Sequence, residues 1–281
     1  MKTSINTLIT ALIVILLVSF SSCKEENKEA QNLLSSATAA YENNDLAKAK
    51  QLIDSIESNH PRAINERKQA YILLQKVRKG ENDVEIKRCD SLLSMLQPQL
   101  DEMKKQFAIQ QNKKYQDKGM YVPKIDPSFS GNSTGLRSGV MEDGDLILES
   151  VYNGGGKHAI VIVNTKDGNF AETKEEYGDG LNYRLGGTEI IRYTPMMENG
   201  VAKFIFDNQD QVITVSLRGQ HTASYVLSNT SKNSIVQSYK LATLMKDIED
   251  AKTSKEKAIL RNQYLEKGGQ DESSQTLSDT H

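Results

Sequence analysis

A repeating seam of apolar residues between positions 83 and 117 constrains this chain more than any other feature. Its members recur at alternating spacings of three and four residues: Ile86, Cys89, Leu93, Leu96, Leu100, Met103 and Phe107. That spacing places them on one side of an α-helix, as in helices that pair along a heptad stripe. We therefore predict a long helix over Asp83–Asp117. Pro98 lies off the seam and predicts a kink or a break near Gln97.

A second long helical pattern, with a weaker heptad, begins at Ser231. It passes through Ile235, Leu241, Leu244, Ile248, Ala251 and Ala258 to about Tyr264, and Lys255 and Asn262 interrupt it. The two long helices flank one domain, and domain termini often lie close together. We expect them to pair antiparallel over ~50 Å, at 1.5 Å per residue, unless the first seam instead pairs two copies of the chain. The helix is predicted over 231–266, followed by a polar, disordered tail over 267–281.

Residues 30–118 are predicted to be helical throughout, because they lack the alternation of strands and are rich in helix-forming residues. Two shorter helices, Ala30–Asn43 and Leu46–Glu57, form a hairpin in which Asp45 caps the second, and a third runs from Pro61 to near Gly80. Within the hairpin, Ala40, Tyr41, Ala49, Ile53, Ile56 and Pro61 resemble one tetratricopeptide-type repeat. That resemblance implies packed helices and, in a stacked array, a groove for a protein partner.

The composition changes at Gly119. Residues 119–230 contain short apolar runs separated by turn-forming residues such as Gly154-Gly155-Gly156 and Asn199-Gly200, which are typical of hairpin turns. The predicted strands are Asp145–Tyr152, His158–Asn164, Asn169–Lys174, Thr188–Thr194, Val201–Phe206, Val212–Leu217 and Ala223–Leu227. This pattern predicts an antiparallel β-sandwich or a barrel-like domain. The fold class is therefore α+β and multidomain, with a helical region before the β domain in the sequence and a long helix after it.

The start of the chain predicts its location. An apolar run from Leu8 to Phe20 follows Lys2; it is shorter than the ~20 residues that span a bilayer but suits a secretion signal. Phe20-Ser21-Ser22-Cys23 resembles the lipobox of bacterial lipoproteins. The resemblance implies that residues 1–22 are a signal peptide and that Cys23 is acylated, for example with palmitate. Residues 23–29 would then link the outer membrane to the folded chain.

Three charged residues follow the cysteine at once. Lys24, Glu25 and Glu26 resemble the lipoprotein export signal of Bacteroidetes, a lysine followed by two acids. That resemblance implies display on the cell surface, and the alternative is a polar linker that happens to be charged.

Composition excludes several classes of partner. Lys and Arg total 35 and Asp and Glu 37, for a net charge of −2, so no basic excess predicts nucleic-acid binding. The histidines at 60, 158, 221 and 281 show no metal-ligand spacing, and neither a metal nor another cofactor is expected. If Cys23 is acylated, Cys89 has no disulfide partner, and its place on the seam predicts a small buried hydrophobe.

Two short motifs fit catalytic or metal-binding patterns but lack the surroundings that those functions need. Ser133 lies in a G-x-S-x-G sequence, but a nucleophile elbow follows a strand and precedes a helix, and here a Pro-containing loop comes first. Glu142, Asp143 and Asp145 carry the hard oxygen ligands that Ca²⁺ prefers, without a full set of ligands at fixed spacing. No catalytic residue is predicted, and the chain is predicted not to be an enzyme.

These patterns predict a lipid-anchored outer-membrane protein that acts as a non-enzymatic binding or scaffold module. Its partner would be another envelope protein, or a second copy through the helical seam. One alternative is a surface receptor for a glycan or a peptide, with a ligand face formed by Tyr152, Tyr177, Tyr183 and Tyr193. The other is an envelope hydrolase, which convergent carboxylates or a histidine beside Ser133 would support.

Overall fold

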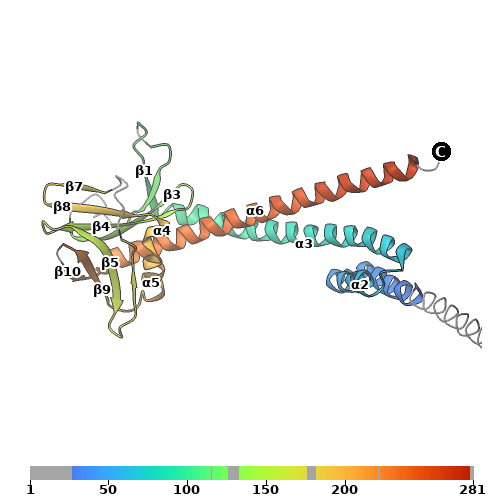
Figure 1. Ribbon diagram of the computed structural model, residues 1–281. Coiled ribbons are helices and arrows are strands. Elements are labelled where there is room, and N and C mark those ends of the chain that lie inside the picture. Colours follow the sequence, from blue (N-terminus) through green and yellow to red (C-terminus); the bar gives the residue numbers. More distant parts are fainter. Residues whose placement is uncertain (1–26, 115, 126–132, 176–181, 221, 279–281) are drawn as a thin grey trace, which may run out of the picture. The chain divides into compact units, whose positions relative to one another are not determined.

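The computed structural model describes residues 27–114, 116–125, 133–175, 182–220 and 222–278 (Figure 1). The chain divides into two compact units. The helical unit comprises the described residues up to Asp90 and from Thr253 onward, and the β unit comprises Ser91–Lys252. The boundary between the units falls inside both long helices. The predicted class, α+β with antiparallel sheets and a long C-terminal helix, is confirmed.

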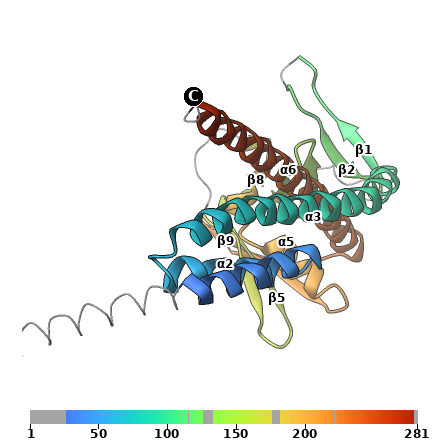
Figure 2. The same cartoon turned by 90° about the vertical axis from the view of Figure 1, so that its right-hand side faces the viewer.

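The helical unit begins with a helix over residues 27–42 and α2 (Leu46–Asn59). Asp45 caps α2 as predicted, because its side chain accepts a hydrogen bond from Lys48 N at 3.1 Å. α2 lies alongside the first part of α3 (Ile64–Lys104) in Figure 2. One buried core joins these helices; it includes Ala37, Ala40, Ala49, Ile53, Ile56, Ala70 and Val77. The predicted hairpin is therefore present, and the helix before it starts no later than residue 27 rather than at 30.

α3 is one continuous helix where the sequence predicted two. It passes through Gly80, where the first was expected to end, and it is not broken at Pro98. Pro98 is exposed, and Leu96 and Leu100 on either side of it pack in the same apolar cluster, so tertiary packing outweighs the missing N–H. The prediction that the helical region reaches residue 118 is wrong, because α3 ends at Lys104 and a strand follows.

α3 pairs antiparallel with α6 (Asn229–Ser278), which confirms the predicted pairing within the chain. In the β unit, Leu93, Leu96, Leu100 and Met103 share a cluster with Leu241, Leu244, Met245 and Ile248. Cys89 is fully buried, as predicted, and burial raises the pKa of its thiol. α6 extends to Ser278, so the prediction of a disordered tail from residue 267 is wrong over most of its length.

The residues that interrupt the second heptad form polar contacts between the two helices in the helical unit. Asn262 accepts a hydrogen bond from Asn82 Nδ2 at 2.9 Å and donates one to Asp83 Oδ1 at 2.7 Å. Lys255 Nζ lies 2.6 Å from Asp90 Oδ1. Asn82 and Asn262 are buried. A buried polar pair specifies the register of paired helices, because any other register leaves these groups unsatisfied.

The β unit contains two antiparallel sheets. Sheet A has the order β1-β2-β3-β4-β8-β7 and sheet B the order β10-β9-β5-β6 (Figure 1). The strands of sheet A are β1 (Phe107–Gln110), β2 (Met120–Pro123), β3 (Gly135–Met141), β4 (Leu146–Asn153), β7 (Tyr183–Leu185) and β8 (Thr188–Tyr193). Those of sheet B are β5 (His158–Thr165), β6 (Phe170–Glu172), β9 (Ile213–Gly219) and β10 (Ala223–Val226).

The main core of the β unit lies between the inner faces of these sheets, α5 (Val201–Asp207) and the start of α6. β5 and β9 alternate as half-buried strands do: Val161, Val163, Ile213, Val215 and Leu217 are buried, and the residues between them are partly exposed. The same cluster includes Leu136, Leu148, Ile191 and Tyr193 of sheet A, Ile205 of α5 and Ile235 of α6. We call the face of sheet A that points away from this core the outer face of sheet A.

Two local predictions in the β unit are wrong. Val201–Phe206 is helix α5, not a strand, because the Glu198 carboxylate at the end of α4 (Pro195–Glu198) accepts hydrogen bonds from Gly200 N and Ala202 N and so caps the helix. Asn199 and Gly200, both at positive φ, therefore link two helices. The glycines at 154–156 carry the chain from sheet A to sheet B and form no hairpin.

Candidate functional site

Three charged residues form a row across three neighbouring strands on the outer face of sheet A. Arg137 on β3 is paired in register with Glu149 on β4, and Glu149 with Arg192 on β8. Arg137 Nε donates to Glu149 Oε2 at 2.7 Å, and Arg192 Nε donates to Glu149 Oε1. The Glu149 side chain is fully buried and that of Arg192 is 33% exposed. The cluster therefore holds the Arg192 guanidinium in a fixed orientation at the surface.

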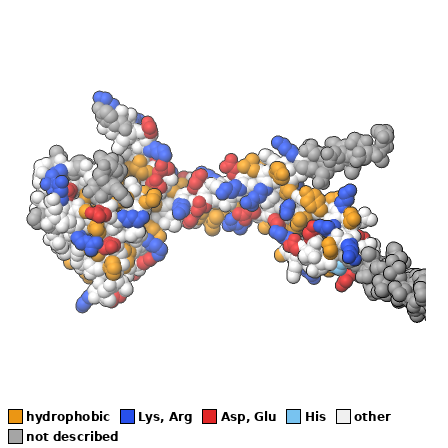
Figure 3. All heavy atoms as spheres, viewed as in Figure 1, with side chains coloured by type: hydrophobic (Ala, Val, Ile, Leu, Met, Phe, Trp, Pro, Cys, Tyr) orange, Lys and Arg blue, Asp and Glu red, His pale blue; other side chains and the backbone are white. Residues whose placement is uncertain are grey.

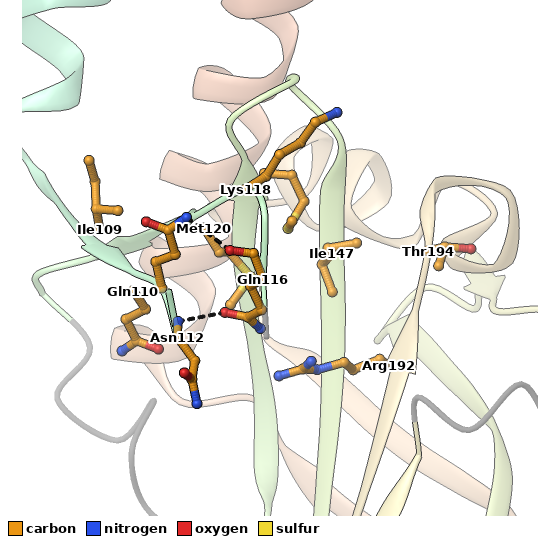
Figure 4. A pocket seen from close by; sticks show the side chains of 11 residues that line it. Ile109, Gln110, Asn112, Gln116, Lys118, Met120, Ile147, Arg192 and Thr194 are labelled. Carbon is orange, nitrogen blue, oxygen red and sulfur yellow. Dashed lines mark hydrogen bonds between the residues drawn. The ribbon is translucent and has the colours of Figure 1, made fainter. Parts of the chain in front are cut away.

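Arg192 borders a pocket of about 770 Å³ on this face (Figure 4). Met120, Met141 and Ile147 give the pocket an apolar part, contributed by β2, β3 and β4. The pocket lies on the outer face of sheet A, bordered by the strands that contribute these residues. A volume of this size is within the range of protein sites that hold small ligands.

Amide side chains supply much of the polar lining. They come from the end of β1 and the loop that follows: Gln110, Gln111, Asn112 and Gln116. Internal hydrogen bonds order this loop, since Asn112 N donates to Gln116 Oε1 at 2.8 Å and Gln111 Nε2 donates to Gln116 O at 3.1 Å. Each side-chain amide has two donors and one acceptor oxygen. These bonds leave both kinds of group available for a ligand.

Two cationic side chains, Lys118 and Arg192, line the pocket, and they differ in how far neighbouring carboxylates neutralise their charge. Lys118 Nζ lies 2.7 Å from Asp143 Oδ2, and this contact raises the pKa of Lys118 and lowers that of Asp143. Arg192 uses only its Nε–H on Glu149, and the terminal guanidinium nitrogens have no partner among the residues that the structure describes. Figure 4 shows the guanidinium directed across the pocket. Arg192 is thus the cation best placed to meet an anionic ligand.

A second polar constellation lies inside the β unit. His158 Nδ1 is 2.9 Å from Glu189 Oε2, and His158 Nε2 is 2.9 Å from Ser150 Oγ. Glu189 Oε2 also accepts a hydrogen bond from His158 N at 2.8 Å. A carboxylate accepts, so Nδ1 carries a proton, and in neutral His158 the Ser150 hydroxyl donates to Nε2. These contacts reproduce the order of a serine–histidine–acid chain.

The environment of Ser150 argues against a reaction at this hydroxyl. The exposed fraction of Ser150 is 0% and that of His158 is 3%. The ring of Tyr152 lies edge-on to His158, with 6.0 Å between centroids. A nucleophile must reach a substrate carbonyl at ~3 Å, and a fully buried oxygen offers no such approach. The hydrogen bonds among these three residues connect strands β4, β5 and β8.

The burial of Ser150 predicts that serine-reactive reagents cannot reach it in the folded chain. A fluorophosphonate probe should leave Ser150 unlabelled in the folded chain, because the reagent needs access to Oγ as well as an activating base. Peptide mapping by mass spectrometry after native and denatured incubation measures the label. A native label on Ser150 that disappears in His158→Gln would contradict the prediction and support the hydrolase alternative.

The predicted tyrosine ligand face does not form as predicted. Tyr193 is fully buried, and its hydroxyl donates to Ala159 O at 3.0 Å, so it cannot belong to an exposed face. Its position on β8 points it into the core that the two sheets share. Tyr152 on β4 is partly buried against the same core. Tyr183 lies on β7, and Tyr177 lies outside the described residues.

Among the other candidate residues, Asp143 contacts the pocket residue Lys118, and the rest lie apart from the pocket or outside the described residues. Ser133 is exposed at a bend before a strand, so the strand-to-helix setting of a nucleophile elbow is missing, and the serine at His158 is Ser150. Glu142 accepts a hydrogen bond from Gly119 N at 2.8 Å in the turn between β3 and β4. No cluster of three or more metal-binding side chains occurs in the described part of the chain. Cys23, Lys24, Glu25 and Glu26 lie outside it.

Sequence reasoning missed the residues that form the pocket. The amides at 110–116 fall within the stretch predicted to be helical, and Arg137 falls in none of the predicted strands. The charge on Arg137, within a run of small residues, was the available signal: a charged residue is buried only when it is paired. Its partner Glu149 is distant in sequence, and no short motif connects them.

Comparisons with known proteins give no relative for this chain. No family model matches it, and no curated protein or solved structure shows significant similarity. Of the helices in the described residues, none combines the length and the apolar character needed to cross a membrane.

Proposed function

We propose that this chain is a lipid-anchored outer-membrane protein and that its β unit is a non-enzymatic binding module. The observation that carries the proposal is the amide-lined pocket on sheet A with Arg192 at its border. The lipobox-like residues before Cys23 support the location, and Lys24, Glu25 and Glu26 favour display on the cell surface. The favoured partner is another protein of the envelope.

The chemistry of the pocket favours a peptide segment that carries a carboxylate. Side-chain amides match the N–H and C=O groups of an extended backbone, and methionine side chains adapt to apolar groups of different shape. A guanidinium binds a carboxylate through two parallel hydrogen bonds. The second candidate is an acidic glycan, but none of the described lining residues has an aromatic ring against which a sugar ring could pack.

A peptide selection tests this proposal. Random seven-residue peptides would be selected on the purified chain, and the enriched sequences measured by fluorescence anisotropy. We expect enrichment of acidic peptides and a loss of affinity of about 10-fold or more in Arg192→Gln, because a hydrogen bond to a charged group contributes about 1.5–3 kcal/mol. Arg218→Gln is the matched control, since Arg218 also pairs with a glutamate but lies on sheet B.

Two outcomes would count against the proposal. The first is peptide binding that is indifferent to Arg192, which would place the ligand elsewhere. The second is binding of acidic oligosaccharides, but not of peptides, with the same dependence on Arg192, which would assign the pocket to the glycan alternative.

A further inference from the structure

A second concave surface lies wholly within the helical unit, between α3 and α6. It has a volume of about 700 Å³. On α3, Tyr71, Gln75 and Arg78 follow one another at helical spacing, and on α6, Leu260, Arg261 and Tyr264 face them across the groove. Two helices that flank a groove give it the straight edges that suit a third helix, which is about 10–12 Å in diameter.

The edges of this groove expose large apolar side chains. Tyr71 is 48% exposed, Leu260 is 54% exposed and Tyr264 is 78% exposed. In the helices of Figure 3, exposed hydrophobic side chains occur between charged ones. A group of exposed apolar residues with a polar border is a common mark of a protein-binding surface, and tyrosine is over-represented among residues that dominate binding energy.

The groove also carries an excess of positive charge. Lys50, Arg78 and Arg261 line it, against the single acid Glu81. Lys50 Nζ lies 3.5 Å from Glu81 Oε1, so these two charges offset each other. Arg78 and Arg261 are exposed and have no ion-pair partner within 4.0 Å among the residues that the structure describes. The complementary surface is therefore apolar at its centre and acidic at its margins.

We propose that this groove binds an amphipathic α-helix of a partner protein, with apolar anchors at positions i, i+4 and i+7 and acidic residues beside them. Helices bind to grooves through anchors at this spacing. A second copy of the chain fits less well, because a twofold contact through this surface would place the same two arginines on both sides of the interface, so that cations would face cations. The inference concerns the helical unit alone and does not depend on the pocket of the β unit.

Two synthetic peptides of opposite charge test the inference. Both are about 18 residues, or ~27 Å of helix, with leucine at the anchor positions; one has glutamate at the flanking positions and the other lysine. With the purified full chain, fluorescence anisotropy should show at least 10-fold tighter binding of the acidic peptide. Tyr264→Ala should weaken that binding at least 5-fold, since the truncated side chain is an exposed contact.

Charge reversal gives the sharpest control. In the double variant Arg78→Glu/Arg261→Glu the preference should invert, so that the lysine peptide binds more tightly than the glutamate peptide. Lys76→Glu/Lys257→Glu makes the same charge change at exposed positions of the same two helices outside the groove, and it should keep the original preference. Circular dichroism melting checks that all variants remain folded.

Three results would overturn the inference. Equal affinity for the two peptides would remove the charge argument. An unchanged preference in the groove double variant would place the binding elsewhere. Self-association that Tyr264→Ala abolishes would assign the surface to a second copy of the chain.

Discussion

Replacing Glu149 by glutamine should lower the free energy of unfolding of the β unit by about 3–5 kcal/mol, the usual cost of breaking a buried ion pair from one side. Glu149 is fully buried and accepts hydrogen bonds from Arg137 and Arg192 on the two neighbouring strands. Glutamine keeps the shape of the side chain but removes its charge, and its NH₂ group would face a guanidinium donor. Arg137, only 8% exposed at its side chain, cannot turn to water in compensation.

Native-state hydrogen exchange of peptides from β3, β4 and β8 measures this change within the β unit alone. Glu172→Gln is the matched control: it is the same substitution in the ion pair that Glu172 on β6 makes with Arg218 on β9, where the two side chains are 41% and 53% exposed. We expect the control to lower stability by less than about 1 kcal/mol. Equal losses in the two variants would show that burial of Glu149 does not have the energetic role inferred from its contacts.

The elements that the sequence predicted correctly are those with a long or clean period. The heptad seam identified α3 and its pairing with α6, because every apolar residue at that spacing must find a partner surface. The short apolar runs predicted at His158–Asn164 and Val212–Leu217 identified two strands of sheet B, β5 and β9. Phe107 shows the limit: it continues the seam and is buried in the same cluster, although it begins strand β1. The pattern revealed its burial and not its backbone conformation.

The errors arose in two situations. In one, a segment fits both the helical and the strand pattern of apolar residues; in the other, the burial of a residue depends on a partner that is distant in the sequence. Val201–Phe206 is apolar at five of its six positions, so strand and helix fit equally, and the cap from Glu198 selects the helix. β3 was missed because Arg137 and Ser138 look like loop residues. Arg137 is buried only because Glu149, on the neighbouring strand, neutralises its guanidinium. The pocket depends on this register, which no local pattern encodes.

The polar residues that interrupt the second heptad also specify how the two long helices pair. Lys255 and Asn262 weakened the second heptad, and both make specific polar contacts with α3. A polar residue at a seam position lowers stability compared with leucine but specifies one register. Asn262 and Lys255 therefore identify which part of α3 faces α6, a fact that the apolar residues alone leave open.

The second large effect is expected from Cys23→Ser, which should move the chain from the membrane fraction to the soluble fraction. Under the proposed location, Cys23 is the attachment point of acyl chains, and a serine hydroxyl cannot form the thioether that holds them. Each buried CH₂ contributes about 0.8 kcal/mol, so loss of the chains removes essentially all of the membrane affinity. Cell fractionation followed by immunoblotting measures the change, and metabolic labelling with palmitate reports the acylation.

Cys89→Ser separates this effect from the general loss of a cysteine. Cys89 is buried on the α3 seam, so its replacement should cost some stability but leave the chain in the membrane fraction, with its palmitate label intact. Retention of Cys23→Ser in the membrane would contradict the lipid anchor, and the location would then have to rest on a protein partner.

Digestion of intact cells with protease, compared between the native sequence and Lys24→Ala/Glu25→Ala/Glu26→Ala, distinguishes surface display from an inward-facing anchor. If those three residues act as an export signal, the triple variant should stay lipidated but become protected from the protease.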